Sequence, residues 1–71
     1  MANSNNEPTS FDGVEIIAST ELAFLMEIDG NLHWIPKSQL LEGGNFDEES
    51  AMGDQGELII PEWLAIEKGL V

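Results

Sequence analysis

The run ELAFLMEIDGNLHWIP, residues 21–36, is the feature that most constrains the fold of this chain. Two stretches rich in apolar residues flank Asp29, Gly30 and Asn31, whose residue types are typical of a tight β-hairpin turn. Leu, Ala, Met and Glu also favour helix, but the turn and the strand formers after it favour the hairpin. The run therefore predicts two antiparallel strands joined by a short loop.

The loop length decides which side chains of this hairpin share a face. A two-residue loop at residues 29–30 places large apolar residues on both faces. A three-residue loop at residues 29–31, ending on a left-handed Asn31, sets Glu27 opposite His33 on one face. It gathers the large apolar residues on the other face: Phe24, Met26, Ile28, Leu32 and Trp34. We therefore predict the three-residue loop.

Four other segments complete the predicted secondary structure. VEIIAST, residues 14–20, predicts a first strand, and ELII, residues 57–60, predicts a fourth. Pro36 has no N–H for a sheet ladder and ends the third strand, after which KSQLL, residues 37–41, suits one helical turn. PEWLAIEKG, residues 61–69, predicts a short helix between a proline and a glycine. The fold class is therefore α+β: an antiparallel sheet of three or four strands, either SH3-like or partly closed, with a short C-terminal helix.

The remaining residues lack the composition of packed elements. Residues 1–12 are rich in Asn, Ser, Pro and Thr and predict a disordered tail. Residues 42–57 contain four glycines and six acids, and we interpret residues 42–56 as a mobile acidic loop whose composition does not support packing. Residues 13–71 then form a single small domain.

The two tryptophans are the largest apolar side chains, and we expect Trp34 and Trp63 to form the two halves of a small core. The alternative is that one of them anchors a partner at the surface. On the predicted helix, Trp63, Ile66 and Leu70 fall on one stripe, with Leu64 beside it.

Residue types that carry catalysis or bind metals are scarce. The chain has no cysteine, one histidine and no arginine. His33 therefore lacks the partners of a nucleophilic or acid–base site, and a pairing with Glu27 is interpreted as a surface contact. An EF-hand that starts at Asn45 has Ser50 where glycine is needed and Gly56 where glutamate is needed. We expect a non-enzymatic protein without a metal or cofactor.

The net charge of the chain limits which classes of partner it can bind. Fourteen acids face two lysines, and the net charge is −12. Nucleic acids and anionic membranes repel such a chain, because both bind through Lys and Arg. A globule of this length is about 28 Å across, so its 12 net charges lie about one per 2.3 Å along that length, against one per roughly 1.7 Å for duplex DNA. The charge predicts a basic protein surface as partner; acidity that only aids solubility is the alternative.

The N-terminal residues MANSNNEPTSFDG lack the basic and apolar regions of a signal peptide. No apolar run approaches the ~20 residues of a membrane span. The absence of cysteine also fits a reducing compartment. We therefore expect a cytoplasmic protein.

The segment WIPKSQ, followed at a distance by IPEWLAIEKGL, resembles small proteins and terminal modules of bacteriophage and prophage origin. These share a strand pair, a Trp-Ile/Leu-Pro-Lys-Ser-Gln signature, a variable acidic loop, and a strand leading to a Pro-Glu-Trp helix start. The matching residues are Trp34, Pro36, Lys37, Ser38, Gln39 and Trp63. The resemblance covers about residues 14–71 and implies a phage context in a host bacterial cytoplasm. In size and acidity the chain is also similar to anti-CRISPR proteins and other DNA mimics, which implies an inhibitor of host nucleic-acid machinery.

These features predict a non-enzymatic phage-type inhibitor that occupies a basic nucleic-acid-binding surface of a host complex. The predicted partner contacts are Glu27, Asp29, Glu42, Asp47, Glu48, Glu49, Asp54, Glu57 and Lys37. Lys37 is interpreted mainly as relief of local negative charge, with a specific partner contact as the alternative. Two other hypotheses are an accessory module of phage replication or recombination that docks through residues 34–39, and a small structural homo-oligomer such as a homodimer.

Overall fold

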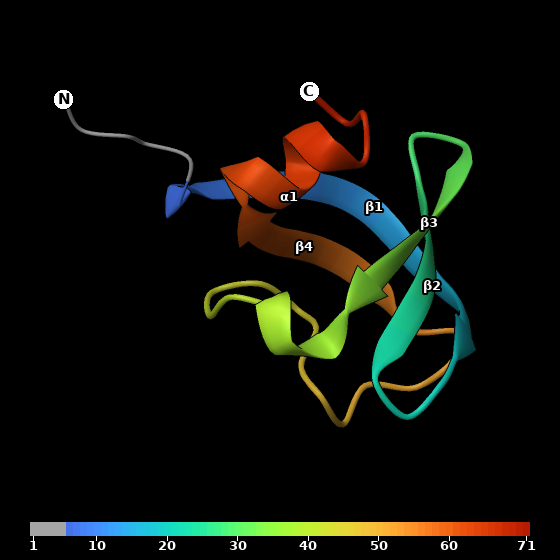
Figure 1. Ribbon diagram of the computed structural model, residues 1–71. Coiled ribbons are helices and arrows are strands. Elements are labelled where there is room, and N and C mark those ends of the chain that lie inside the picture. The colour runs from blue at the N-terminus through green and yellow to red at the C-terminus, as the bar shows by residue number, and fades with distance from the viewer. Residues whose placement is uncertain (1–5) are drawn as a thin grey trace, which may run out of the picture.

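The computed structural model describes residues 6–71 as a four-stranded antiparallel sheet with one short helix against it (Figure 1). The elements follow in the order β1 (Pro8–Ser19), β2 (Ala23–Ile28), β3 (Asn31–Pro36), η2 (Lys37–Gln39), β4 (Gln55–Pro61) and α1 (Glu62–Glu67). The strands lie in the order β3-β2-β1-β4, so β3 and β4 are the edges. The predicted α+β class, the helical turn after Pro36 and the C-terminal helix are confirmed.

Strand β1 is one of the two inner strands and pairs with β4 along its first part and with β2 along its last part. Residues 8–15 pair with β4, and residues 15–19 pair with β2. The ladder shifts register twice, around Gly13 and again between Ile16 and Ala18. Gly13 has a φ of +69°, which glycine adopts without steric penalty, so it can occupy this irregularity. The sheet is strongly curled (Figure 1), and the buried side chains of its strands belong to one apolar cluster.

The prediction of a disordered tail over residues 1–12 is wrong for residues 8–12, which belong to β1. Thr9 and Phe11 are half-buried while the residues around them are exposed, and Phe11 packs against the core. The partner strand is β4, far along the chain, so local composition gave no sign of this pairing. Residues 1–5 lie outside the described part of the chain.

The β2–β3 hairpin has a two-residue loop, so the predicted three-residue loop is wrong. Asp29 and Gly30 both have positive φ, +54° and +84°, as a type I′ turn requires, and Asn31 is already in β3. The cross-strand pairs are Ile28 with Asn31, Glu27 with Leu32, Met26 with His33, and Leu25 with Trp34. The predicted pairing of Glu27 with His33 therefore does not form.

This register turns Trp34 outward and Ile35 inward. Trp34 is 45% exposed, whereas Ile35 is fully buried. The expectation that Trp34 forms half of the core is therefore wrong, although Trp63 does pack against the core from α1. The two-residue turn matches the twist of its strands. In the resulting register, Ile35 occupies the core position, and the indole of Trp34 lies on the outer face of the sheet.

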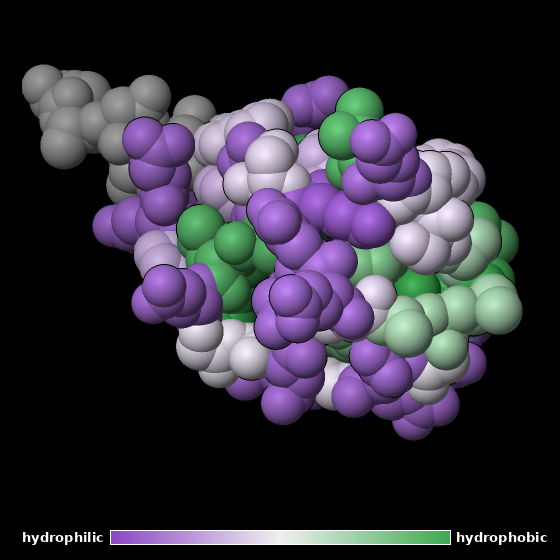
Figure 2. Space-filling model, turned by 90° about the horizontal axis from the view of Figure 1, so that it is seen from below, coloured by the Kyte–Doolittle hydropathy of each residue, from purple (hydrophilic) through white to green (hydrophobic). Residues whose placement is uncertain are grey.

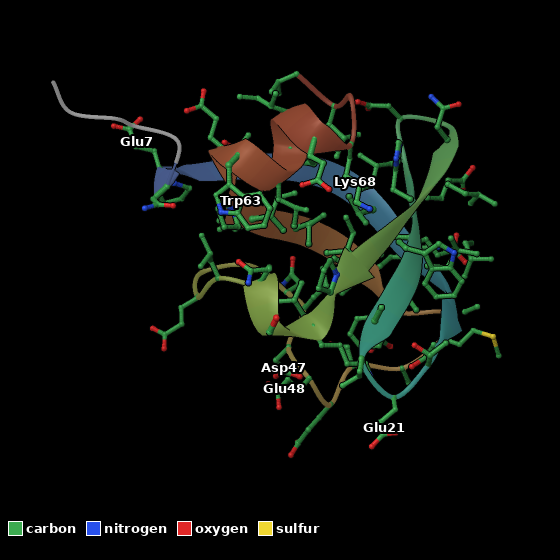
Figure 3. All side chains as sticks on the ribbon, viewed as in Figure 1. Glu7, Glu21, Asp47, Glu48, Trp63 and Lys68 are labelled. Atoms are coloured by element: carbon green, nitrogen blue, oxygen red, sulfur yellow. The ribbon has the colours of Figure 1, made fainter. Side chains whose placement is uncertain are left out.

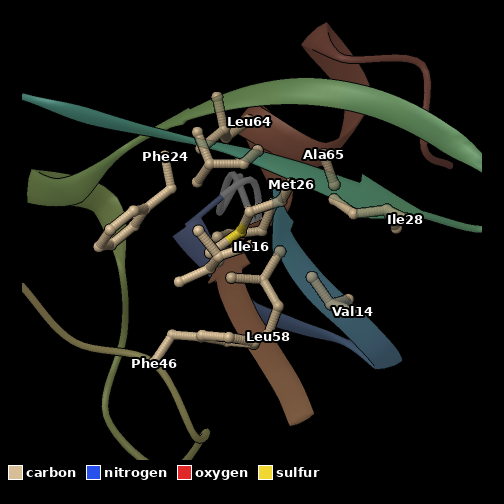
Figure 4. Close-up of a cluster of buried hydrophobic side chains, with 11 residues drawn as sticks. Val14, Ile16, Phe24, Met26, Ile28, Phe46, Leu58, Leu64 and Ala65 are labelled. Atoms are coloured by element: carbon tan, nitrogen blue, oxygen red, sulfur yellow. The ribbon is translucent and has the colours of Figure 1, made fainter. Parts of the chain in front are cut away.

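The core lies between the curled sheet and α1 (Figure 4). Its buried side chains are Val14, Ile16, Phe24, Met26, Ile28, Ile35, Phe46, Leu58, Ile60, Leu64 and Ala65. Leu64 and Ala65 are the buried residues of α1, and Leu70 packs beside them. Ile66 is 50% exposed, so the predicted helical stripe is wrong at that position. The short helix thus buries the face centred on Leu64.

The segment between η2 and β4 packs against the sheet, contrary to the prediction from its composition. Phe46 is buried in the core. The N–H of Leu41 donates to the C=O of Ile59 over 2.9 Å, and the N–H of Asn45 donates to the C=O of Glu57 over 2.8 Å. The Asn45 side-chain oxygen also accepts the N–H of Glu57 over 2.7 Å. These bonds cover the outer edge of β4, which would otherwise present unpaired backbone groups.

Candidate acidic interface

The turn η2 positions Lys37 where β3 leaves the sheet. Pro36 ends the strand, and the N–H of Lys37 donates to the C=O of Leu22 over 2.9 Å. The Lys37 ammonium lies over the ring of Phe24, with Nζ 4.6 Å from the ring centroid. Such a cation–π contact contributes about 0.5–2 kcal/mol, depending on desolvation. Lys37 therefore has a structural role as a cover for the buried phenyl ring.

Four exposed acids surround this turn: Glu21, Glu42, Asp47 and Glu48, which we call the acidic face. A shallow pocket of about 460 Å³ lies beside Lys37 and has Glu21 and Glu48 in its walls. A smaller pocket of about 170 Å³ on the loop side has Glu42, Asp47 and Glu48 in its walls. Two segments distant in sequence therefore bring their carboxylates to one end of the molecule.

The figures show how these acids are presented. Glu21, Asp47 and Glu48 all lie at the lower end of the molecule in Figure 3, whereas Glu7 lies at the upper left. Seen from below in Figure 2, a hydrophilic band crosses this end between two hydrophobic areas. The acidic face is therefore open to solvent and accessible to a partner.

Hydrogen bonds within the loop give its acids defined positions. The Asp47 carboxylate accepts the N–H of Glu49 over 2.8 Å, and the N–H of Asp47 donates to Ser50 Oγ over 2.9 Å. The Asp54 carboxylate accepts the N–H of Ala51 over 2.9 Å. Asp47 and Asp54 thus act partly as local capping groups, a role common for aspartate in turns. Together with buried Phe46, these bonds shape the backbone that carries Glu48 and Glu49.

Other predicted contact residues lie elsewhere. Glu27 is on the outer face of the sheet, paired with Glu15 on β1 and with Leu32 on β3. Asp29 is in the β2–β3 turn, which Figure 1 places at the end opposite η2. Glu57 is half-buried on β4, where its backbone bonds to the loop. The structure therefore gathers only part of the predicted set into one face.

Glu21 belongs to the acidic face but was absent from the predicted contacts. The sequence pattern predicts Glu21 at the start of a strand, whereas it lies in a turn that connects β1 to β2. Thr20 closes this turn, since its Oγ1 accepts the N–H of Ala23 over 3.1 Å and its N–H donates to the Ala23 C=O over 2.8 Å. In the sequence, Thr20 is the residue that indicates this turn, because threonine hydroxyls can bond to the backbone of a turn.

Within residues 6–71, no three His, Asp or Glu side chains are placed to hold a metal ion together. None of the helices in that range is long and apolar enough to cross a bilayer. No protein-family model, curated protein or solved structure matches this chain. The resemblance to phage proteins therefore stays a prediction from short motifs.

Proposed function

We propose that this chain is a non-enzymatic, phage-type inhibitor that occupies a basic nucleic-acid-binding surface of a host complex through its acidic face. The observation that carries the proposal is the convergence of Glu21, Glu42, Asp47 and Glu48 at one solvent-exposed end of a chain whose net charge is −12. A groove lined with Lys and Arg attracts such a surface for the reason that it attracts phosphates.

Anchoring of the loop favours this use of the acids. Phe46 is buried directly before Asp47 and Glu48, and the loop backbone bonds to β4 at Asn45. A partner therefore meets carboxylates whose backbone is already ordered, so less conformational entropy is lost on binding. Lys37 reduces the local negative charge only in part, because four acids surround one ammonium group.

The test compares two variants of equal charge. One carries Glu21→Gln, Glu42→Gln and Glu48→Gln on the acidic face. The control carries Glu7→Gln, Asp12→Asn and Glu67→Gln, three exposed positions elsewhere. Each has a net charge of −9, from −12 plus the three neutralised acids. A difference between them therefore reports the position of the charge.

The full chain is immobilised, exposed to lysate of bacteria that express CRISPR effectors, and washed at about 50 mM and about 200 mM NaCl. We expect captured nucleic-acid-binding proteins to be released by added duplex DNA and by the higher salt, and to be retained better by the control than by the acidic-face variant. Equal retention by both variants, or capture that is undiminished by the wash at about 200 mM NaCl, contradicts the proposal.

A second candidate is a module that docks on a protein partner through residues 34–39. The observation that favours it is the outward orientation of Trp34, since exposed tryptophans are enriched at binding hot spots. This function predicts salt-tolerant binding that Trp34→Ala abolishes and that the acidic-face variant leaves unchanged. The same lysate experiment therefore separates the two functions.

A further inference from the structure

The outer edge of β3 carries backbone groups that point away from the sheet. β3 is an edge strand and pairs only with β2. Because Ile28 and Asn31 directly flank the two-residue turn, they form a hydrogen-bonded pair, and such pairs alternate along an antiparallel ladder. The amides and carbonyls of Leu32 and Trp34 therefore face outward. Among residues 6–71, no backbone hydrogen bond outside the sheet reaches either residue.

The side chains at this edge are apolar and exposed. Leu32 is 55% exposed and Trp34 is 45% exposed, and both project from the outer face of the sheet. Trp34 continues a cross-strand row through half-buried Leu25 and Ala18. Natural edge strands are commonly protected by charges, bulges or prolines. Here Pro36 lies only at the end of the strand, so the edge before it is open to another strand.

Charge distinguishes this edge from the rest of the molecule. Residues 30–41 form the longest stretch of the sequence without an acid, and they include His33 and Lys37. Everywhere else the acids are more closely spaced along the chain. The edge strand itself contributes no carboxylate, and the acid next to it on the outer face is Glu27 on β2, which pairs with Leu32. Two copies of a chain with a net charge of −12 repel each other less where the strands in contact carry no acids of their own.

We propose that the β3 edge is a self-association surface on which a second copy of this chain adds its own β3 in antiparallel orientation. With His33 at the two-fold axis, Leu32 lies opposite the partner's Trp34, and the symmetry repeats the pair. The outward N–H and C=O groups of both residues then bond across the axis. Each Leu32 side chain packs beside the partner's Trp34 on the same face, as cross-strand neighbours do. Pro36 has no N–H and ends the ladder.

This arrangement has a salt dependence that sets it apart from the proposed function. Salt screens the repulsion between two anionic subunits, so the dimer strengthens as NaCl is raised from about 50 mM to about 500 mM. Binding of the acidic face to a basic groove weakens over the same range. The dimer does not rest on the proposed function, and the failure of one leaves the other standing.

Sedimentation velocity on the full chain, over a range of concentrations and at both salt levels, tests the proposal. Trp34→Glu places a carboxylate at the contact and is expected to raise the dimer dissociation constant by at least about tenfold. Met52→Glu is the matched control, because Met52 is 69% exposed on the loop and the charge change is identical. We expect the control to dimerise like the unmodified chain.

Amide hydrogen exchange gives an independent readout of strand pairing. The amides of Leu32 and Trp34 are expected to become protected as the protein concentration rises, since they bond only in the dimer. Three results overturn the proposal: a monomer at about 0.5 mM protein in high salt, a dimer that persists in Trp34→Glu, or a dimer without this protection. With the monomer, the β3 edge remains available to a strand of another protein.

Discussion

Replacing Phe46 by alanine tests whether the acidic loop is anchored in the core. Phe46 is the one large side chain that residues 42–54 contribute to the buried cluster, and it is 6% exposed. It lies directly before Asp47 and Glu48 of the acidic face. A mobile loop, as the composition predicted, would place this phenyl ring in solvent and make the substitution nearly neutral.

Because Phe46 is buried, the structure predicts a large loss of unfolding free energy for Phe46→Ala. Burying a phenylalanine removes about 150–250 Å² from water, which at about 25 cal/mol per Å² corresponds to roughly 4–6 kcal/mol. A compact denatured state lowers that figure by about 10–40%, so we expect Phe46→Ala to reduce the unfolding free energy by about 3 kcal/mol. A domain of this length has a total stability of roughly 4–10 kcal/mol. The variant therefore loses a large part of its stability, and its Tm falls by about 12–24 °C.

Urea denaturation followed by tryptophan fluorescence measures this loss, because Trp63 packs against the same core. Met52→Ala is the control: it lies in the same loop but is 69% exposed, so its effect should stay within about 0.5 kcal/mol. A loss below about 0.5 kcal/mol for Phe46→Ala would refute the packing described for the loop, and with it the ordered presentation of the acids.

Three other substitutions test individual contacts near the acidic face and the loop. Lys37→Gln removes the cation over Phe24 and should reduce the unfolding free energy by about 1 kcal/mol in urea denaturation; an unchanged midpoint argues against that contact. Gly44→Ala places a methyl group 2.7 Å from the carbonyl oxygen of Glu57 and should cost about 1–3 kcal/mol, with a fall in Tm as the readout; a variant as stable as the original contradicts this close approach. Glu48→Gln relieves repulsion in the acidic face and should raise Tm in low salt but not at about 0.5 M NaCl; an equal effect in both salts excludes an electrostatic cause.

Part of the acidic face could be predicted from the sequence. Glu42, Asp47 and Glu48 were expected to act together because they are close in the chain. Glu21 joins them only because the turn closed by Thr20 brings the β1–β2 connection beside η2. Asp29 is also a predicted contact residue, but it lies at the far end of the hairpin, because the length of β3 separates it from η2. Proximity in sequence therefore predicts loop clusters better than it predicts contacts between elements.

The sequence alone predicts the turns and the strand and helix ends, because these depend on the backbone angles that individual residue types allow. Asp29-Gly30 gives a turn, Pro36 ends a strand, and Gly69 follows the last helix, because each restricts or permits particular backbone angles. The net charge likewise follows from composition. Folding settled the choices for which the local pattern offers two answers. A shift of one residue in the hairpin exchanges its faces. The folded chain has the register that places Ile35 in the core cluster shared with β1, β4 and α1 and leaves Trp34 45% exposed.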